Sequence, residues 1–227
     1  MPYGHTSPCK IIKINEAGHP IPDNAGIQGA REIVQLLKET QEDDLLLCLI
    51  SGGGSALFEL PCEGITIKEL QNTTDLLLKS GARIDEINAI RKHISQVKGG
   101  RLANIGKAEI VSLILSDVVH DQVDTIASGP TVPDSSTFSD CKRIFIKYGL
   151  LQKIPASIID HIQNGVDGKA EETPKTNDKI FDNVFHVIIG NNRMALRGCY
   201  KKAITLGFNT CILSSCIKGE AREVAKV

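Results

Sequence analysis

The chain has 227 residues, of which 41% are hydrophobic and 23% are charged, an ordinary globular composition that allows one large domain or two small ones. Its 26 basic and 27 acidic residues give a net charge of -1, which predicts neither a nucleic-acid footprint nor a surface for anionic membranes. No run approaches the roughly 20 apolar residues of a membrane span, and the start MPYGHTSPCK has no signal-peptide pattern. We therefore expect a soluble protein of the cytoplasm, or of the mitochondrion if a targeting segment precedes Met1.

The seven cysteines are an odd number with irregular spacing, and no Cys-x-x-Cys pair occurs among them. Several lie inside apolar runs such as LLLCLI and TCILSS. This pattern predicts reduced, mostly buried thiols, and neither a disulfide framework nor a zinc site.

In chain order, apolar runs suit buried strands at residues 10–14, 45–50, 109–116, 184–190 and 208–215. Helical patterns lie between them at 27–38, 66–81, 85–97, 138–148 and 192–206, and Pro155 suits the first turn of a further helix. Thr66 and Glu69 form a capping box at the start of the second of these helices. The alternation predicts an α/β fold: a doubly wound, mainly parallel sheet with helices on both faces.

Two segments near the end of the chain carry separate expectations. Residues 167–179 are polar and contain Pro174, which predicts a solvated loop that tolerates insertion or nicking. The final GEAREVAKV has the pattern of the opening turns of a helix directly after the last predicted strand. We therefore expect the chain to stop inside a fold rather than at a domain boundary.

The sharpest motif is the glycine loop SGGGS at residues 51–55, directly after the predicted strand 45–50. Three consecutive glycines let several backbone N–H groups approach an anion, and ligands of parallel α/β sheets bind beyond the carboxyl ends of the strands. The loop matches neither the P-loop nor the dinucleotide pattern G-x-G-x-x-G. It predicts a phosphate or substrate site, with a simple strand-to-helix turn as the alternative.

Two further motifs carry charge beside flexible backbone. Arg91 is followed by Lys98-Gly99-Gly100-Arg101, whose cations could grip a phosphate or carboxylate; a helix stop with solvated charges is the alternative. The predicted strand 109–116 delivers Asp117 and Asp121, which could hold Mg²⁺ or act as a base, or could only cap the loop.

Three smaller signals complete the candidates. The loop after Asp121 contains Ser128 and Gly129. Asn191 follows the predicted strand 184–190 and could contact a ligand, although capping the next helix is the better interpretation. His19 and His120 are possible acid–base groups, but a lone histidine is more often structural.

Five blocks in this order closely resemble the glycerate kinases related to bacterial glycerate 2-kinase, a family once labelled hydroxypyruvate reductases. The blocks are GHPIPD, LLLCLISGGGSAL, INAIRKHISQVKGGRLA, SLILSDVVHDQVDTIASGPTVPD and VIIGNN. The resemblance extends from about Glu16 to Gly219, and the stretch DCKRIFIKYGL is most similar to the animal members.

This resemblance implies ATP and Mg²⁺ as cosubstrates and D-glycerate as the phosphoryl acceptor. It implies that residues 1–227 are part of a larger N-terminal α/β domain, with a smaller C-terminal domain missing after Val227. As catalytic residues it suggests Arg91, Lys98, Asp117 and Asp121, with Asp117 as the metal ligand. As cofactor-binding residues it suggests Ser51, Gly52, Gly53, Gly54, Ser55, Gly99, Gly100, Arg101, Ser128, Gly129 and Asn191.

The chain departs from the family pattern at two places. His120 stands where a glycine is usual, and no glycine-lysine block, which in the family supplies a catalytic lysine, precedes Met1. Two alternatives to a kinase therefore stay open: an inactive portion that only binds ligand, and a nicotinamide-dependent hydroxypyruvate reductase. The second is disfavoured because no G-x-G-x-x-G follows a strand.

Overall fold

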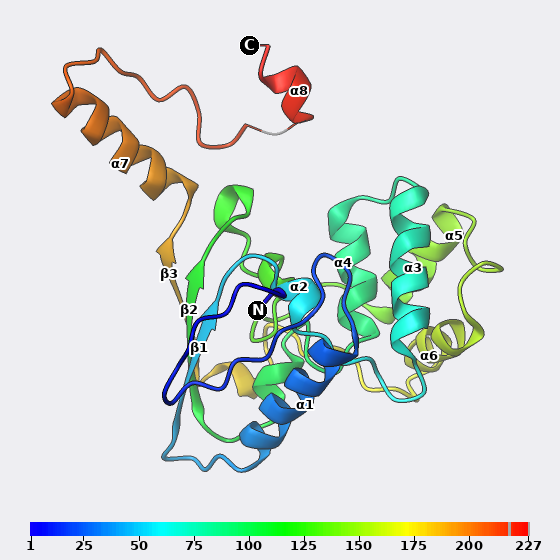
Figure 1. Ribbon diagram of the computed structural model, residues 1–227. Helices are drawn as coiled ribbons and strands as arrows, with labels where there is room; N and C mark the ends of the chain where they lie inside the picture. The colour runs from blue at the N-terminus through cyan, green and yellow to red at the C-terminus, as the bar shows by residue number, and fades with distance from the viewer. Residues whose placement is uncertain (218, 227) are drawn as a thin grey trace.

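The computed structural model describes residues 1–217 and 219–226 and is built on a parallel sheet (Figure 1). Its strands are β1 (Leu45–Ile50), β2 (Glu109–Leu115) and β3 (Val184–Gly190), in the spatial order β1-β2-β3. Both neighbouring pairs are parallel, and Leu47 pairs with Val111, which pairs with Phe185. These three predicted strands and the α/β class are confirmed, and the carboxyl ends of β1 and β2 meet at one edge of the sheet.

One face of the sheet packs on helix α1 (Asn24–Lys38). Asp23 caps this helix by accepting a hydrogen bond from the Gly26 N–H at 3.0 Å. The helix buries Ile27, Ala30 and Leu37 in a core shared with Leu60, Val97 and Leu102. Figure 1 shows no helix over the opposite face of the sheet, so among the described residues helices cover one face instead of the two that we expected.

The four central helices form a layer of their own beside the sheet (Figure 1). They are α3 (Ile67–Lys79), α4 (Ile84–His93), α5 (Phe138–Lys147) and α6 (Ala156–Val166). Capping boxes open α3 at Thr66 and α5 at Thr137. Their apolar stripes meet in a second core around Leu77, Phe138 and Phe145, because each helix buries its apolar stripe against the others.

Shorter elements and a final long helix complete the chain. Helix α7 (Asn192–Thr205) confirms the last predicted helix but has no buried residue, and α8 (Ala221–Val224) falls within the predicted terminal helix. None of the helices described is long and apolar enough to cross a membrane. The remaining elements are α2 (Gly54–Leu57), η1 (Arg101–Asn104), η2 (Val119–Asp121), η3 (Ile126–Ser128) and η4 (Lys179–Phe181).

Two predicted strands are wrong. Residues 10–14 and 208–215 form no regular element and pair with no strand of the described chain, and Ile11 and Leu213 are 97% and 86% exposed. A strand needs a partner backbone for its N–H and C=O groups, and an apolar run alone does not supply one.

Two other expectations also change. The helix predicted to reach residue 97 ends at His93, because Ile94 and Gln96 form backbone hydrogen bonds with Cys62 and Leu60. The thiols are free but not mostly buried: Cys62 and Cys141 are buried and Cys48 is half-buried, whereas the others are exposed, namely Cys9, Cys199, Cys211 and Cys216.

Candidate functional site

The glycine loop turns directly from β1 into α2. Gly53 has φ +83°, a left-handed conformation, and a Cβ there would lie 3.2 Å from His19 Nε2. Within the described residues, the backbone N–H groups of Gly52, Gly53, Gly54 and Ser55 have no hydrogen-bond acceptor. The predicted anion-binding loop therefore has unused donors at the carboxyl end of β1.

A second loop, which contains η3, packs tightly against the glycine loop. Ala127, Ser128 and Gly129 all have positive φ, at 52°, 60° and 58°. A Cβ on Gly54 would lie 2.6 Å from the Ala127 Cβ, so no larger residue fits at Gly54. The hydroxyls of Ser55 and Ser128 are 2.9 Å apart, and Ser128 is fully buried. Two blocks that are distant in sequence are thus brought together.

The two predicted carboxylates lie beyond β2 at the same edge. The exposed Asp117 carboxylate occupies the space that a side chain at Gly52 would take, and none of the described residues donates a hydrogen bond to it. Asp121, by contrast, accepts a hydrogen bond from Asn191 Nδ2 at 2.7 Å. The Asn191 side chain also accepts a hydrogen bond from the Met194 N–H at 2.9 Å, so it caps α7, as we expected for this residue.

His120, the departure from the family pattern, keeps a glycine-like backbone. Its φ is +68° and it is followed by Asp121 at +54°. The exposed ring lies with Nδ1 3.7 Å from the Cys216 sulfur. The change from glycine therefore leaves the left-handed turn in place, at a cost in backbone strain.

A cavity of about 190 Å³ opens beside the glycine loop, lined in part by His19, Gly53, Ser55, Glu59 and Arg91. Within the described chain the half-buried Arg91 guanidinium has no hydrogen-bond acceptor and no ion-pair partner. Burial lowers the pKa of Arg91 and the nearby Glu59 carboxylate opposes this shift. Arginine remains charged throughout the physiological range, so the cavity presents a fixed cation with free donors.

Lys98 lies beneath this cavity rather than in it. Its ammonium is fully buried and forms an ion pair with Glu59 Oε2 at 2.9 Å, and it donates a hydrogen bond to the Phe58 carbonyl at 2.7 Å. Burial lowers the pKa of Lys98, and the adjacent Glu59 carboxylate opposes the shift. The sequence patterns did not predict a role for Glu59, although a lone acid in the apolar stretch ALFELPC was a usable signal.

The glycine pair after Lys98 supports the η3 loop. The N–H groups of Gly99 and Gly100 donate to the carbonyls of Ser128 and Gly129 at 3.0 and 2.8 Å, so they are not free to bind an anion. Arg101 points to the other side, where it donates a hydrogen bond to the Glu171 carbonyl at 2.8 Å. The structure therefore places Arg101 away from the glycine loop.

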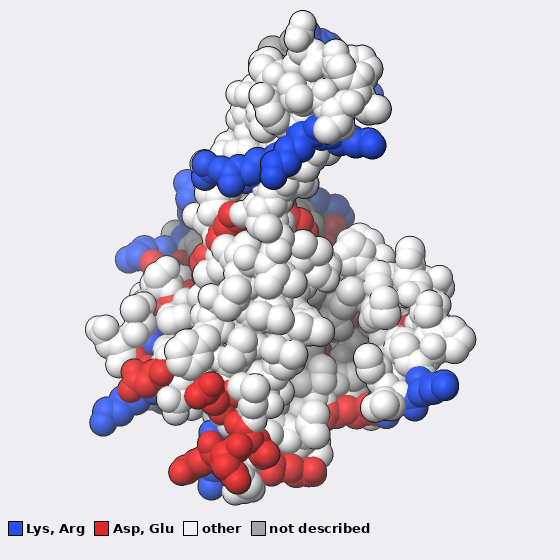
Figure 2. Space-filling view, turned by 90° about the vertical axis from the view of Figure 1, so that its left-hand side faces the viewer, with Lys and Arg blue, Asp and Glu red and all other residues white. Residues whose placement is uncertain are grey.

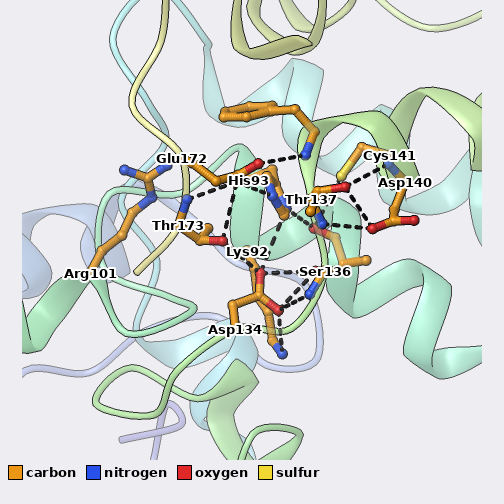
Figure 3. A network of polar contacts seen from close by, with 12 residues as sticks. Lys92, His93, Arg101, Asp134, Ser136, Thr137, Asp140, Cys141, Glu172 and Thr173 are labelled. Carbon is orange, nitrogen blue, oxygen red and sulfur yellow. Dashed lines mark hydrogen bonds and ion pairs between the residues drawn. The ribbon is translucent and has the colours of Figure 1, made fainter. Parts of the chain in front are cut away.

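A buried polar network fastens the long loop 167–179 to the end of α4 (Figure 3). His93 Nε2 lies 2.7 Å from Glu172 Oε1, and the Thr173 hydroxyl donates to Asp134 Oδ2 at 3.0 Å. Lys92 Nζ lies 3.3 Å from Asp134 Oδ1. Thr173 is buried, so the prediction of a solvated loop is wrong at its centre.

A larger cavity of about 500 Å³ adjoins this network, but each cation in its described lining already forms an ion pair. Lys92 is paired with Asp124 and Asp134, and the other two cations lining the cavity are also paired. These two pairs are Arg143 with Asp140 and Lys147 with Glu86. The smaller cavity at the glycine loop is therefore the better candidate for binding an anion.

Comparisons with known proteins show the family of this chain. The family model described as "Domain of unknown function (DUF4147)" matches residues 1–163. The glycerate 2-kinase of Pyrococcus horikoshii is 49% identical over 221 residues, which cover 97% of this chain and 50% of that protein. The D-glycerate 2-kinase of Thermotoga maritima is 42% identical over 228 residues, covering 99% and 51%.

Animal glycerate kinases match as well; the human protein is 42% identical over 207 residues, covering 91% of this chain and 38% of its own length. A crystal structure of the Thermotoga maritima glycerate kinase superposes with a TM-score of 0.82 at 44% identity, covering 93% of this chain and 49% of that one. The resemblance to glycerate kinases is confirmed, and the chain spans about half the length of the two kinases first compared. Because the family model matches 163 of its 227 residues, the chain belongs to the DUF4147 family.

Proposed function

We propose that this chain contributes the phosphate- and glycerate-binding half of a glycerate kinase, which transfers the γ-phosphoryl group of ATP to D-glycerate. One observation carries the proposal: the glycine loop, the η3 loop and Asp117 converge at the carboxyl ends of β1 and β2, beside the Arg91 cavity. The names of the relatives from Pyrococcus and Thermotoga support the same reaction.

Phosphoryl transfer depends mainly on the positioning of the substrates and on charge neutralisation, and different residues of the site are suited to these tasks. The free N–H groups of the glycine loop are suited to phosphate oxygens, with the Ser55 hydroxyl alongside. Arg91 is suited to the carboxylate of glycerate, because a guanidinium binds a carboxylate through two parallel hydrogen bonds. Lys98 acts as a positioning residue, since it holds Glu59 in the wall of the cavity.

Mg²⁺ fits the two carboxylates beyond β2. Within the described residues no group of three or more His, Cys, Asp or Glu could hold a metal, but Mg²⁺ in kinases commonly uses one or two carboxylates together with substrate phosphates. Asp117, to which none of the described residues donates a hydrogen bond, would hold the ion, and Asp121 would be a second candidate ligand. When bound, the ion would neutralise charge on the phosphates. Asp121 or Asp117 would orient the glycerate hydroxyl.

Ligand binding without turnover is the second candidate, because the chain spans only about half of its relatives. A reductase is a weaker candidate. The Agrobacterium vitis relative is named "Putative hydroxypyruvate reductase" and is 38% identical over 226 residues, covering 99% of this chain and 56% of that protein. However, the sequence has no dinucleotide fingerprint after any of its strands.

The test combines turnover with binding. ADP release is coupled to NADH oxidation in the presence of ATP, Mg²⁺ and D-glycerate, with glycerate omitted as the control, and the heat of binding of each ligand is measured separately. The kinase proposal predicts glycerate-dependent ADP release. Binding of ATP and glycerate without release supports the second candidate, and the absence of both refutes the assigned site.

Two variants make the result specific. Arg91→Met should abolish the heat of glycerate binding, while Arg143→Met, at the larger cavity, serves as the matched control and should leave it unchanged. If both variants bind glycerate as the parent does, Arg91 is not the carboxylate ligand. Oxidation of NADH by hydroxypyruvate in the absence of coupling enzymes would instead favour the reductase.

A further inference from the structure

The buried cation Lys92 has no part in the reaction proposed above. On the face of the molecule that Figure 2 shows, lysine and arginine side chains protrude into solvent, whereas Lys92 is only 4% exposed. In the last turn of α4 it follows Arg91, which lines the small cavity, and precedes His93, which belongs to the polar network of Figure 3. A buried ammonium is costly unless it is paired, so the partners of Lys92 indicate its role.

Lys92 contacts two acids, one at each end of the η3 loop. Its Nζ lies 3.4 Å from Asp124 Oδ2 and 3.3 Å from Asp134 Oδ1. Asp134 is buried and also accepts hydrogen bonds from the hydroxyls of Ser136 and Thr173 (Figure 3). The Asp124 carboxylate, by contrast, accepts a hydrogen bond from no other residue of the described chain. One cation therefore fastens both ends of the loop.

The backbone of the η3 loop is strained and has to be held in place. Ala127 and Ser128 have φ values of 52° and 60°, which residues with a side chain rarely adopt, and such conformations persist only where their surroundings fix them. A Cβ on Gly129 would lie 3.0 Å from the Asp124 carbonyl oxygen, so the strained turn packs directly on Asp124. A shift of Asp124 would therefore displace the turn.

The aliphatic part of Lys92 supports the same loop at a second position. A Cβ on Gly99 would lie 3.0 Å from the Lys92 Cβ, so the two residues are in close contact. The Gly99 N–H in turn donates a hydrogen bond to the Ser128 carbonyl at 3.0 Å. The stem and the ammonium of Lys92 thus both act on the η3 loop.

We propose that Lys92 is a positioning residue of the phosphate site. It neutralises Asp124 and Asp134 and so keeps the η3 loop in place. The loop in turn holds the Ser128 hydroxyl 2.9 Å from that of Ser55, in the glycine loop. A glycine loop that is held in this way keeps its N–H groups directed at the phosphate, and preorganised donors lose less entropy on binding. This inference rests on the proposed function, because it takes the glycine loop as the phosphate site.

Lys92 is not placed to bind phosphate itself. Two carboxylates share its ammonium, so the local net charge is negative and a phosphate beside it would be repelled. The larger cavity, which Lys92 lines, also carries more acids than cations. Lys92 therefore acts through the η3 loop and not on a ligand.

The first test needs no ligand and measures hydrogen exchange of backbone amides in the whole chain. Lys92→Met leaves the buried Asp134 without its cation and could unfold the chain, so Asp124→Ala, which removes only the more exposed pair, is the milder second variant. In both variants the amides of Ser128 and Gly129 should exchange about 10-fold faster or more. The amides of α6 should change by less than about 3-fold in Asp124→Ala.

The matched control for exchange is Lys147→Met, which breaks an ion pair with Glu86 at the same cavity but does not touch the η3 loop. It should leave the exchange of the loop unchanged. Equal acceleration of the loop and of α6 in Asp124→Ala would indicate a general loss of stability and would overturn the proposal. Unchanged exchange at Ser128 and Gly129 would overturn it as well.

The second test measures the heat of binding of ADP and, separately, of D-glycerate. Mg²⁺ is omitted, so that Asp117 takes no part. Asp124→Ala should raise the dissociation constant of ADP about 10-fold and change that of glycerate, whose proposed ligand is Arg91, by less than about 3-fold. Equal weakening of both ligands would overturn the positioning role. If the parent chain binds no ADP, the phosphate site itself is refuted, whereas equal ADP binding by parent and variant refutes only the role of Lys92.

The third test asks whether the effect passes through Ser128. In a Ser128→Ala background, Asp124→Ala should weaken ADP binding by less than about 3-fold, because the contact with Ser55 is already lost. An undiminished effect of about 10-fold in that background would show that Asp124 and Lys92 act by another route, and would overturn the proposal.

Discussion

The buried pair of Glu59 and Lys98 gives a prediction that can be worked through in numbers. The Lys98 ammonium lies 2.9 Å from Glu59 Oε2, and Glu59 Oε1 accepts a hydrogen bond from the Leu60 N–H at 3.0 Å. Both side chains are essentially inaccessible to water. Glu59→Gln keeps the shape of the side chain but removes its charge, and its single amide oxygen can serve only one of these two donors.

The expected cost is large. At an effective dielectric constant of about 20, unit charges roughly 3 Å apart attract each other by about 5 kcal/mol, and breaking a buried pair by removing one partner costs about 3 to 5 kcal/mol. Lys98→Met should cost a similar amount, since it leaves the Glu59 carboxylate uncompensated. The double variant should recover at least about 2 kcal/mol of the summed loss, because neither charge then remains.

The pH dependence separates this mechanism from a loss of packing. Burial lowers the pKa of Lys98 and the Glu59 carboxylate opposes that shift. In Glu59→Gln the opposing interaction is gone, so the pKa of Lys98 in the folded chain falls further below its ordinary 10.5. Between the two values the unfolded chain binds a proton that the folded chain does not, so the free energy of unfolding rises with pH.

The assay is urea unfolding followed by circular dichroism at several pH values between about 6 and 9. The variant should be least stable relative to the parent at the lowest pH, and the difference should shrink as the pH rises. A loss below about 1 kcal/mol in both single variants, or a difference that does not change with pH, would refute the reasoning.

Three further predictions concern acid stability, backbone strain and thiol reactivity. Burial raises the pKa of Glu172, but hydrogen bonds from His93 and two backbone N–H groups outweigh burial and bring the pKa to about 2. The ionised Glu172 therefore stabilises the folded chain above its ordinary pKa of 4.5, and this stabilisation is lost as the pH falls toward 2. Glu172→Gln should therefore flatten the fall in unfolding free energy over that range, and an unchanged profile would contradict this. His120→Gly should raise the unfolding free energy by about 0.5 to 1 kcal/mol, because φ is +68°; a lower melting temperature would contradict it. Titration of the thiols in the folded chain should leave Cys62 and Cys141 unreacted, because burial raises the pKa of Cys62 to about 11 and that of Cys141 well above its ordinary value. Labelling of all seven cysteines without unfolding would count against the buried cores.

Local signals in the sequence were enough for most elements of the fold. The strands β1, β2 and β3 are continuous apolar runs, and the capping box at Thr66 marks a helix start through contacts only three residues apart. Residues 10–14 and 208–215 have the same apolar character but no partner strand within the described chain. Pairing depends on a second backbone, which hydrophobicity does not report.

The position of the helices relative to the sheet could not be predicted for a similar reason. An apolar stripe shows that a helix is buried on one side, but not what it is buried against. Helices α3 to α6 pack on one another around Phe138 and Phe145 and leave one face of the sheet open. The expectation of helices on both faces assumed the sheet as their only partner.

The candidate site shows the same division between local and distant information. The sequence places the glycine loop and Asp117 after strands that we expected to be parallel. The structure makes these strands neighbours, which brings their carboxyl ends together. Nothing in the motif around Lys98 distinguishes it from Arg91, since each is a cation near a helix end. The difference comes from Glu59, a residue far upstream whose carboxylate neutralises Lys98 and leaves Arg91 without an ion-pair partner in the described structure.

A hydrogen-bond donor that is already used within the protein cannot bind a ligand, so the free donors decide what this chain can bind. Lys98, Gly99 and Gly100 use donors within the protein, whereas Arg91 and the glycine loop keep theirs free among the residues described. One guanidinium and a few N–H groups are enough to bind a carboxylate or a phosphate, because each such charge-assisted hydrogen bond is strong. A transferring phosphoryl group spreads charge over three oxygens and requires more compensation, which bound Mg²⁺ at Asp117 would have to supply. Glycerate binding should therefore depend on Arg91 with or without the metal, whereas ADP release should require Mg²⁺.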